Sequence, residues 1–108
     1  MARDVMRGDV WLYTFKKPDK RRPVLIVSRK EVINLLRTVT VAPITSTIHG
    51  APSEVIVGIE QGLKNTSAAN MDHLLTVPQS QLHTYVGHLD EQKLGEVCRA
   101  MAVALGCR

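Results

Sequence analysis

Apolar and polar side chains follow one another along this chain in short stretches that predict β-strands, and the last stretch predicts a helix. Residues 9–15 alternate between two faces that are both mostly apolar, which predicts a strand covered on both sides. The apolar runs 23–28 and 38–44 predict two buried strands, and Pro43 lies near the end of the second, where proline is tolerated. The polar segment 16–21 separates the first two strands and predicts a hairpin turn.

Weaker patterns in the second half of the chain predict further strands and turns. Residues 53–57 alternate well enough for a strand, and the small and apolar residues 66–77 predict either one strand or a bent pair. A short helical turn is expected over 78–82 and a closing strand over 85–89. Residues 29–37 fit either a helical turn or an irregular connection, and the pattern leaves both open.

The final segment has the spacing of an amphipathic helix. Asp90 is a suitable N-cap and Gly106 a suitable C-terminal cap. The apolar positions between them are Leu94, Val97, Cys98, Met101, Ala104 and Leu105. Many short strands followed by one such helix predict a mainly β fold, a small and strongly bent antiparallel sheet or partly open barrel that the helix covers on one side.

The size of the chain limits what it can contain. With 108 residues it is expected to form a single domain over residues 1–108, without room for a separate cofactor domain. Aromatic residues make up only 4% of the chain, so the core must consist mainly of aliphatic side chains. A domain of this length buries only about two-thirds of its unfolded surface, and oligomerisation would add stability.

Positive charge is concentrated in the first predicted hairpin. The formal net charge is +4, and five basic residues fall within seven positions, namely Lys16, Lys17, Lys20, Arg21 and Arg22. Such a cluster favours a polyanion such as nucleic acid through counterion release. A solvated hairpin tip or a site for an acidic protein would explain the same charges.

Other reactive residues argue against a metal or redox site. Cys98 and Cys107 are too far apart for a CxxC pair, and the four histidines match no zinc-binding spacing, so we expect neither metal nor cofactor. The N-terminus has no apolar signal core, and no run approaches the roughly 18 apolar residues of a membrane span. We therefore expect a soluble, cytoplasmic protein with reduced cysteines.

Two strand ends carry candidate chemistry. Arg22 opens the second apolar run and Thr45 closes the third, and a guanidinium fixed beside a hydroxyl suits binding and polarising a phosphodiester. Arg22 could instead pair with Asp19, and Thr45 could bond nearby backbone as strand-end hydroxyls often do. Ser46 and Thr47 follow directly and could take the role of Thr45.

Three segments in this order resemble the MazF/PemK family of toxin endoribonucleases: Arg7–Trp11, Arg22–Ser28 and Val41–Thr45. The resemblance covers nearly the whole chain and implies an SH3-like small barrel, a homodimer and inhibition by a cognate antitoxin protein. It also implies metal-independent cleavage of single-stranded RNA, such as mRNA, at a short recognition sequence. Carried over by motif, Arg22 and Thr45 would act at the scissile phosphate.

The mechanism implied by this resemblance is attack of the RNA 2′-hydroxyl on the adjacent phosphorus, which leaves a 2′,3′-cyclic phosphate and a free 5′-hydroxyl. The general base stays open between Asp72, a histidine and a second subunit. Of the acid and base of the PemK/Kid branch, only the aspartate is matched, within Asn70-Met71-Asp72, so that branch's arrangement is not transferred.

RNA contacts are expected around these two residues. The predicted set comprises Lys16, Lys17, Lys20, Arg21, Ser46, Asn70, Asp72 and Gln79. Two alternatives of another class remain: a non-catalytic toxin like the CcdB relatives that bind DNA gyrase, and a non-catalytic RNA-binding module on the same barrel. The C-terminal Gly106-Cys107-Arg108 lacks the aromatic terminus expected of a gyrase-binding wedge.

Overall fold

The computed structural model describes residues 4–15 and 20–107. The strands are β1 (Asp9–Phe15), β2 (Lys20–Ile26), β3 (Thr38–Thr45), β4 (Glu54–Val57), β5 (Ser67–Asn70), β6 (Leu75–Pro78) and β7 (Leu82–His88). Two α-helices, α1 (Lys30–Leu35) and α2 (Glu91–Ala104), and three single 3₁₀ turns, η1 (Ile59–Gln61), η2 (Met71–His73) and η3 (Gln79–Gln81), complete the order.

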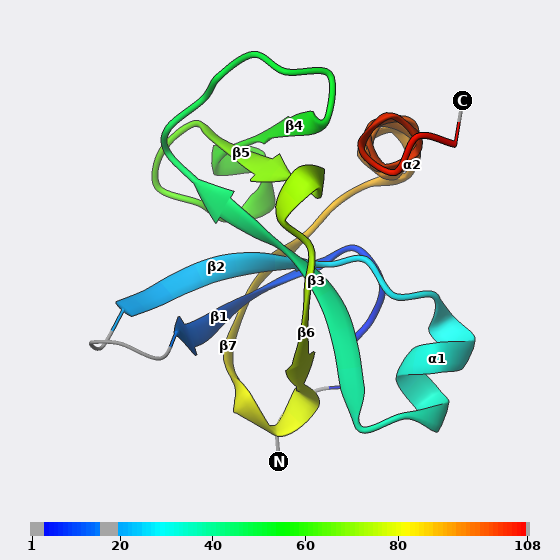
Figure 1. Cartoon of the computed structure of the whole chain (residues 1–108). Helices are drawn as coiled ribbons and strands as arrows, with labels where there is room; N and C mark the ends of the chain where they lie inside the picture. The colour runs from blue at the N-terminus through cyan, green and yellow to red at the C-terminus, as the bar shows by residue number, and fades with distance from the viewer. Residues whose placement is uncertain (1–3, 16–19, 108) are drawn as a thin grey trace.

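All strand pairings in the sheet are antiparallel. The order is β4-β5-β3-β2-β1-β7, and β6 pairs with the first half of β3 (Figure 1). The sheet bends strongly without closing, because β4 and β7 stand at its two ends in the part of the chain that the structure describes. The expected mainly β fold with a bent antiparallel sheet and a C-terminal helix is confirmed, in the open form of the small barrel.

Alternation along the central strands feeds two separate apolar clusters. In β2, Leu25 packs with the cluster under α2, which includes Val97 and Ala100 of that helix. Val24 and Ile26 point to the other face and join a cluster around Trp11. Both faces of β2 are therefore covered, as its continuous apolar run predicts. Trp11 is 2% exposed and packs edge-on against Tyr85, so it is a core residue.

The predicted elements agree with the structure in most places. The alternating run 9–15 is β1, the open alternative at 29–37 is resolved in favour of the short helix α1, and 66–77 forms the bent pair β5 and β6 around η2. Both predicted caps of α2 are present, since Asp90 Oδ1 accepts the N–H of Lys93 at 2.9 Å and Gly106 has a φ of 70°.

Two strands begin earlier than the apolar pattern predicts. β2 starts at Lys20 instead of Pro23, and β7 starts at Leu82 instead of Tyr85. The reason is pairing with β1, which brings Phe15 opposite Lys20 and Tyr13 opposite Leu82. A neighbouring strand extends the ladder through residues whose own side chains give no strand signal.

A buried carboxylate ties the start of β1 to the end of β7. Asp9 is 0% exposed, and its Oδ2 accepts both the Met6 N–H at 2.9 Å and the Trp11 Nε1–H at 3.1 Å. His88 Nδ1 lies 2.7 Å from the other oxygen. Burial of this charge is tolerated because each of its oxygens has a close partner. Neither α1 nor α2 has the length and apolar character needed to cross a bilayer.

Candidate functional site

The candidate site forms where the pairing of β3 with β2 ends. β3 pairs with β2 from Val41 to Pro43, and on its other edge it pairs with β5 at Ile44 and Thr45. The pairing of β3 with β2 ends at Pro43. Proline has no backbone N–H to donate to a neighbouring strand. The two strands separate beyond this point and leave space between them.

A cavity of about 470 Å³ occupies this space. Its volume lies within the range of small-molecule sites, about 300 to 1,000 Å³. It is lined by Leu12, Arg22, Pro23, Ile44, Thr45, Ser46, Gly62, Leu63, Lys64, Asn65, Ser67 and Val86. Three of the residues singled out from the sequence, Arg22, Thr45 and Ser46, therefore lie at one cavity.

The antiparallel register explains why Arg22 and Thr45 come together. β2 and β3 pair Ile26 with Val41, Leu25 with Ala42 and Val24 with Pro43. Continued by two residues, the same register sets Arg22 opposite Thr45. Directly opposed residues of antiparallel strands have Cβ atoms about 5 Å apart, and the separation of the strands at this end widens that gap into the cavity.

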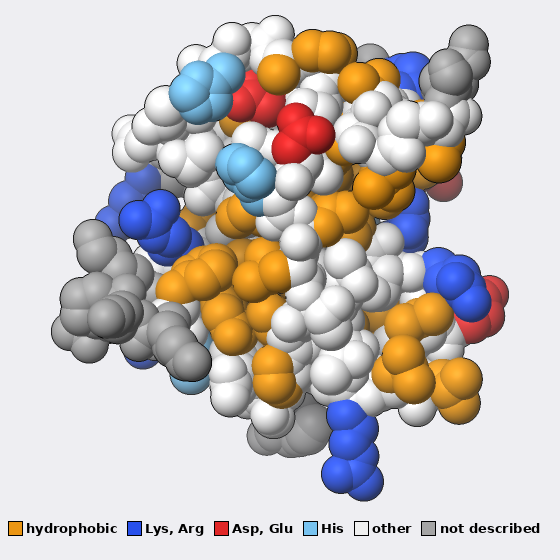
Figure 2. Space-filling model, in the orientation of Figure 1, with side chains coloured by type: hydrophobic (Ala, Val, Ile, Leu, Met, Phe, Trp, Pro, Cys, Tyr) orange, Lys and Arg blue, Asp and Glu red, His pale blue; other side chains and the backbone are white. Residues whose placement is uncertain are grey.

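The charged side chains of the described lining are both positive. Arg22 and Lys64 are its charged members, and among the described residues around the cavity there is no aspartate or glutamate. Neither cation has an ion pair within residues 4–15 and 20–107. Figure 2 shows lysine and arginine side chains at the left edge of the molecule, beside an apolar patch, and others at its lower and right edges. An exposed guanidinium and ammonium without carboxylate partners favour an anionic ligand.

The hydroxyl of Thr45 is oriented by backbone and still has a proton to donate. Its Oγ1 accepts the N–H of Thr47 at 3.2 Å, which is the backbone bond considered from the sequence. That bond uses an oxygen lone pair and leaves the O–H as a donor. Thr45 is half-buried and Ser46 is exposed, so of these two hydroxyls that of Thr45 is the more constrained.

Glu54 fixes the loop that continues from Thr45 and Ser46. Its carboxylate accepts the backbone N–H groups of His49, Gly50 and Ala51, the shortest from Gly50 at 2.8 Å. Partial desolvation raises the pKa of Glu54, but the three backbone donors and the nearby His49 lower it more, and the pKa lies below its ordinary value of 4.5. The ionised carboxylate therefore stabilises this loop.

Three of the residues predicted to contact RNA lie away from the cavity, and their side chains make hydrogen bonds within the fold. Asn70 Oδ1 accepts the N–H of Asp72 at 2.8 Å, and Asp72 Oδ2 accepts the hydroxyl of Ser53 at 2.5 Å. Gln79 Nε2 donates to the carbonyl of Ile33 in α1 at 2.9 Å and to that of Leu36, the C-cap of this helix, at 2.8 Å. None of the three lines the cavity that holds Arg22, so any RNA contact they make would be outside it.

The basic hairpin is only partly described. Arg21 is exposed on β2 opposite Thr14 and is not part of the cavity lining. Lys20 opens β2, its side chain lies outside the described part, and Lys16 and Lys17 lie outside the described residues altogether. Their role in RNA binding stays a prediction.

The sequence analysis missed Lys64 and Asn65, which reach the cavity from the segment between η1 and β5. Gly62 just before them marks a turn in the sequence, but nothing local says what the turn faces. Only the pairing of β5 with β3 brings this segment beside Thr45, which pairs with Ala68. The missing signal is thus one of topology.

Comparison with known proteins finds a family match over almost the whole chain. The family described as "PemK-like, MazF-like toxin of type II toxin-antitoxin system" matches residues 6–105. A relative from Mycobacterium tuberculosis, "Probable endoribonuclease MazF5", is 36% identical over 104 residues, covering 94% of this chain and 93% of the relative. "Endoribonuclease MazF3" from the same species is 41% identical over 88 residues, 82% of either chain.

Solved structures agree with this assignment. "Mycobacterium tuberculosis toxin MazF-mt6" superposes with a TM-score of 0.82 at 34% identity, covering 91% of this chain and 96% of that one. A mycobacterial protein solved as "Endoribonuclease in complex with its cognate antitoxin" gives a TM-score of 0.86 at 26% identity, covering 96% of this chain and 97% of that one.

Proposed function

Because the chain belongs to the PemK-like, MazF-like family of type II toxins, we propose that it is a sequence-specific endoribonuclease that cuts single-stranded RNA without metal or cofactor. The observation that carries this proposal is the meeting of Arg22 and Thr45 at one cavity whose described lining holds no acidic side chain. The endoribonuclease names of the relatives support the same activity.

In the proposed reaction, the 2′-oxygen of a ribose forms a bond to the adjacent phosphorus while the bond from phosphorus to the 5′-oxygen breaks. The 2′-hydroxyl proton passes to a base, and the leaving 5′-oxygen takes up a proton. Arg22 neutralises the charge that grows on the phosphoryl oxygens, and Thr45 donates a hydrogen bond to the same centre. One preorganised donor of this kind is worth about 2.7 to 4 kcal/mol of barrier.

The base is the unfilled role in this scheme. The described lining holds no histidine and no carboxylate. Arginine gives up its proton only above a pH of about 12. We therefore assign the base to a group outside the described lining, and Asp72, a histidine and the second protomer of a homodimer stay open as its source. DNA lacks the 2′-hydroxyl nucleophile and should not be cut.

Within this proposal the physiological substrate is messenger RNA in the cytoplasm, and the regulator is a cognate antitoxin. An acidic antitoxin segment would complement the charges of Arg22 and Lys64 and cover the cavity. The mycobacterial relative solved with its own antitoxin supports this partnership.

The test is cutting of a long RNA by purified protein in the presence of a chelator. We expect defined fragments with 5′-hydroxyl ends and at least 100-fold slower cutting by Arg22→Ala. Arg37→Ala is the matched control, because Arg37 is an exposed arginine at a different cavity, and it should cut at the wild-type rate. Absence of cutting by the wild type would instead favour a non-catalytic toxin or RNA-binding module.

A further inference from the structure

We propose that Lys64 is a second phosphate-binding residue of this site and holds a backbone phosphate next to the one at Arg22. The proposal rests on the proposed function, since it takes the ligand to be a single RNA strand. It adds a specific residue from a segment that has no part in the Arg22 and Thr45 pair. Lys64 would contact the substrate directly.

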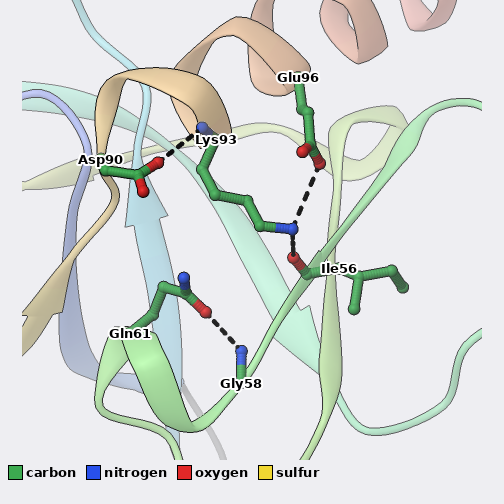
Figure 3. A network of polar contacts seen from close by, with 6 residues as sticks. All are labelled: Ile56, Gly58, Gln61, Asp90, Lys93 and Glu96. Carbon is green, nitrogen blue, oxygen red and sulfur yellow. Dashed lines mark hydrogen bonds and ion pairs between the residues drawn. The ribbon is translucent and has the colours of Figure 1, made fainter.

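Lys64 carries a positive charge that no described side chain neutralises. Lys64 is exposed and lines the same cavity as Arg22. Lys93, in contrast, is engaged, because its Nζ donates to the carbonyl of Ile56 at 2.6 Å and lies 3.3 Å from Glu96 (Figure 3). Lys64 has no such partner within the described chain. Its charge is therefore available to a ligand in the cavity.

The segment carrying Lys64 is held firmly against the sheet. Gly62 has a φ of 90°, and a Cβ at this position would collide with the carbonyl oxygen of Val86. A Cβ on Gly87 would likewise collide with the carbonyl oxygen of Gln61. This close backbone approach on both sides joins η1 to β7 immediately before Lys64.

Hydrogen bonds complete this support. The side chain of Gln61 is buried and its Oε1 accepts the N–H of Gly58 at 2.7 Å (Figure 3). The N–H of Leu63 donates to the Gly58 carbonyl at 3.1 Å, one residue before Lys64. A cation on a segment fixed in this way loses less conformational entropy on binding than one on a loose loop.

The ammonium group of Lys64 determines which ligands this residue can recognise. An ammonium group donates three hydrogen bonds and accepts none, so it responds to negative charge rather than to the pattern of a base edge. A cavity of about 470 Å³ is large enough for more than one phosphate-sized group. Two cations from separate elements, β2 and the segment after η1, would then hold consecutive phosphates and fix the direction of the strand.

The experiment compares Lys64→Ala with Lys30→Ala, a matched loss of one positive charge. Lys30 is exposed at the start of α1 and does not line this cavity. The probe is a random-sequence single-stranded oligonucleotide, 2′-O-methylated at every ribose so that it cannot be cut. Its Kd is measured by fluorescence anisotropy over a range of salt concentrations, and cutting of unmodified RNA is measured in parallel.

For Lys64→Ala we expect the slope of log Kd against log salt to fall by about 0.7, the value for one phosphate contact on a single strand. Its kcat/KM for RNA should fall about 10-fold to 100-fold with unchanged product ends. Lys64→Arg should keep most of the salt slope and most of the kcat/KM. Lys30→Ala should match the wild type in both quantities. Thermal unfolding of each variant checks that the fold is intact.

The outcomes separate this inference from the proposed function. If the wild type cuts RNA and Lys64→Ala keeps the salt slope of Lys30→Ala, the role of Lys64 is wrong and the proposed function stands. If the probe binds with the expected dependence on Lys64 but no RNA is cut, the phosphate contact stands and the nuclease proposal fails. A wild type that neither binds the probe nor cuts RNA contradicts both, and one that cuts RNA without binding the probe contradicts the phosphate contact alone.

Discussion

At the scale of single residues, a few backbone-facing side chains set the shape of the site. Glu54 accepts three consecutive backbone N–H groups of the loop that follows Ser46. Thr45 accepts the N–H of Thr47. The hydroxyl of Thr45 is thus positioned in two ways. Its oxygen accepts a backbone N–H two residues further on, and the carboxylate of Glu54 holds the loop that follows.

The lowered pKa of Glu54 predicts a pH-dependent contribution to stability. A carboxyl whose pKa is lower in the folded state than its ordinary 4.5 stabilises the fold fully above pH 4.5, and this is lost as the pH falls through the folded-state pKa. Glu54→Gln should therefore lower Tm by a few degrees at most at pH 7, and by less at pH 3. Thermal unfolding at both pH values measures the difference.

Glu60→Gln is the matched control, because Glu60 is an exposed glutamate of η1. It should leave Tm unchanged at pH 7. An equal Tm difference between wild type and Glu54→Gln at the two pH values would contradict the role given to the ionised carboxylate.

Residues of the candidate site could be predicted from the sequence where they lie at the end of a predicted strand. Arg22 opens one apolar run and Thr45 closes another, and a strand end fixes a side chain well enough to suggest a shared site. Lys64 has no comparable signal, because it follows a turn whose neighbours in space are set by distant strands. Asn70, Asp72 and Gln79 look available in the sequence, whereas in the structure each is bonded to a turn or helix end.

At the scale of elements, the contact between η1 and β7 supports one side of the cavity. Gly62 and Val86 both line it, and their backbones meet so closely that a Cβ on Gly62 would collide with the Val86 carbonyl. Only glycine fits at both Gly62 and Gly87, so these two positions determine how near the Lys64 segment lies to the sheet.

Gly62→Ala should therefore be strongly destabilising. The substitution adds a collision to an unfavourable backbone conformation, and we expect a loss of about 3 kcal/mol or more in the free energy of unfolding. Gly50→Ala separates the two effects, because Gly50 has a φ of 77° with no atom within 4 Å of an added Cβ. It should lose only about 1 kcal/mol.

Urea unfolding of both variants measures these losses. Equal destabilisation at the two glycines would mean that the backbone conformation alone matters, and that η1 and β7 can separate without loss.

Element boundaries show where the sequence signal ends. The alternation of 9–15 and the spacing of the last helix contain enough information to predict β1 and α2. The first residues of β2, Lys20 to Arg22, are polar and gave no strand signal, yet they pair along β1. Such extensions depend on the neighbouring strand, which a single sequence does not specify.

At the scale of the whole molecule, the site follows from the topology of the sheet. β3 pairs with β2, β5 and β6 in different parts of its length, and the cavity opens where the pairing with β2 ends. The family resemblance predicts this bent sheet, and the matches to MazF structures confirm it. The position of the segment after η1 relative to β3 is a property of the assembled fold, so the sequence alone did not reveal the second cation.

The central claim is that Arg22 and Thr45 act on the same phosphate. A double-mutant cycle of the single-turnover RNA cleavage rate tests it most directly, using Arg22→Ala, Thr45→Ala and the double variant. Groups that act as a unit give strongly non-additive losses, so we predict that the double variant is slowed little more than Arg22→Ala alone. Losses that simply multiply, about 100-fold by about 100-fold, would contradict a shared centre.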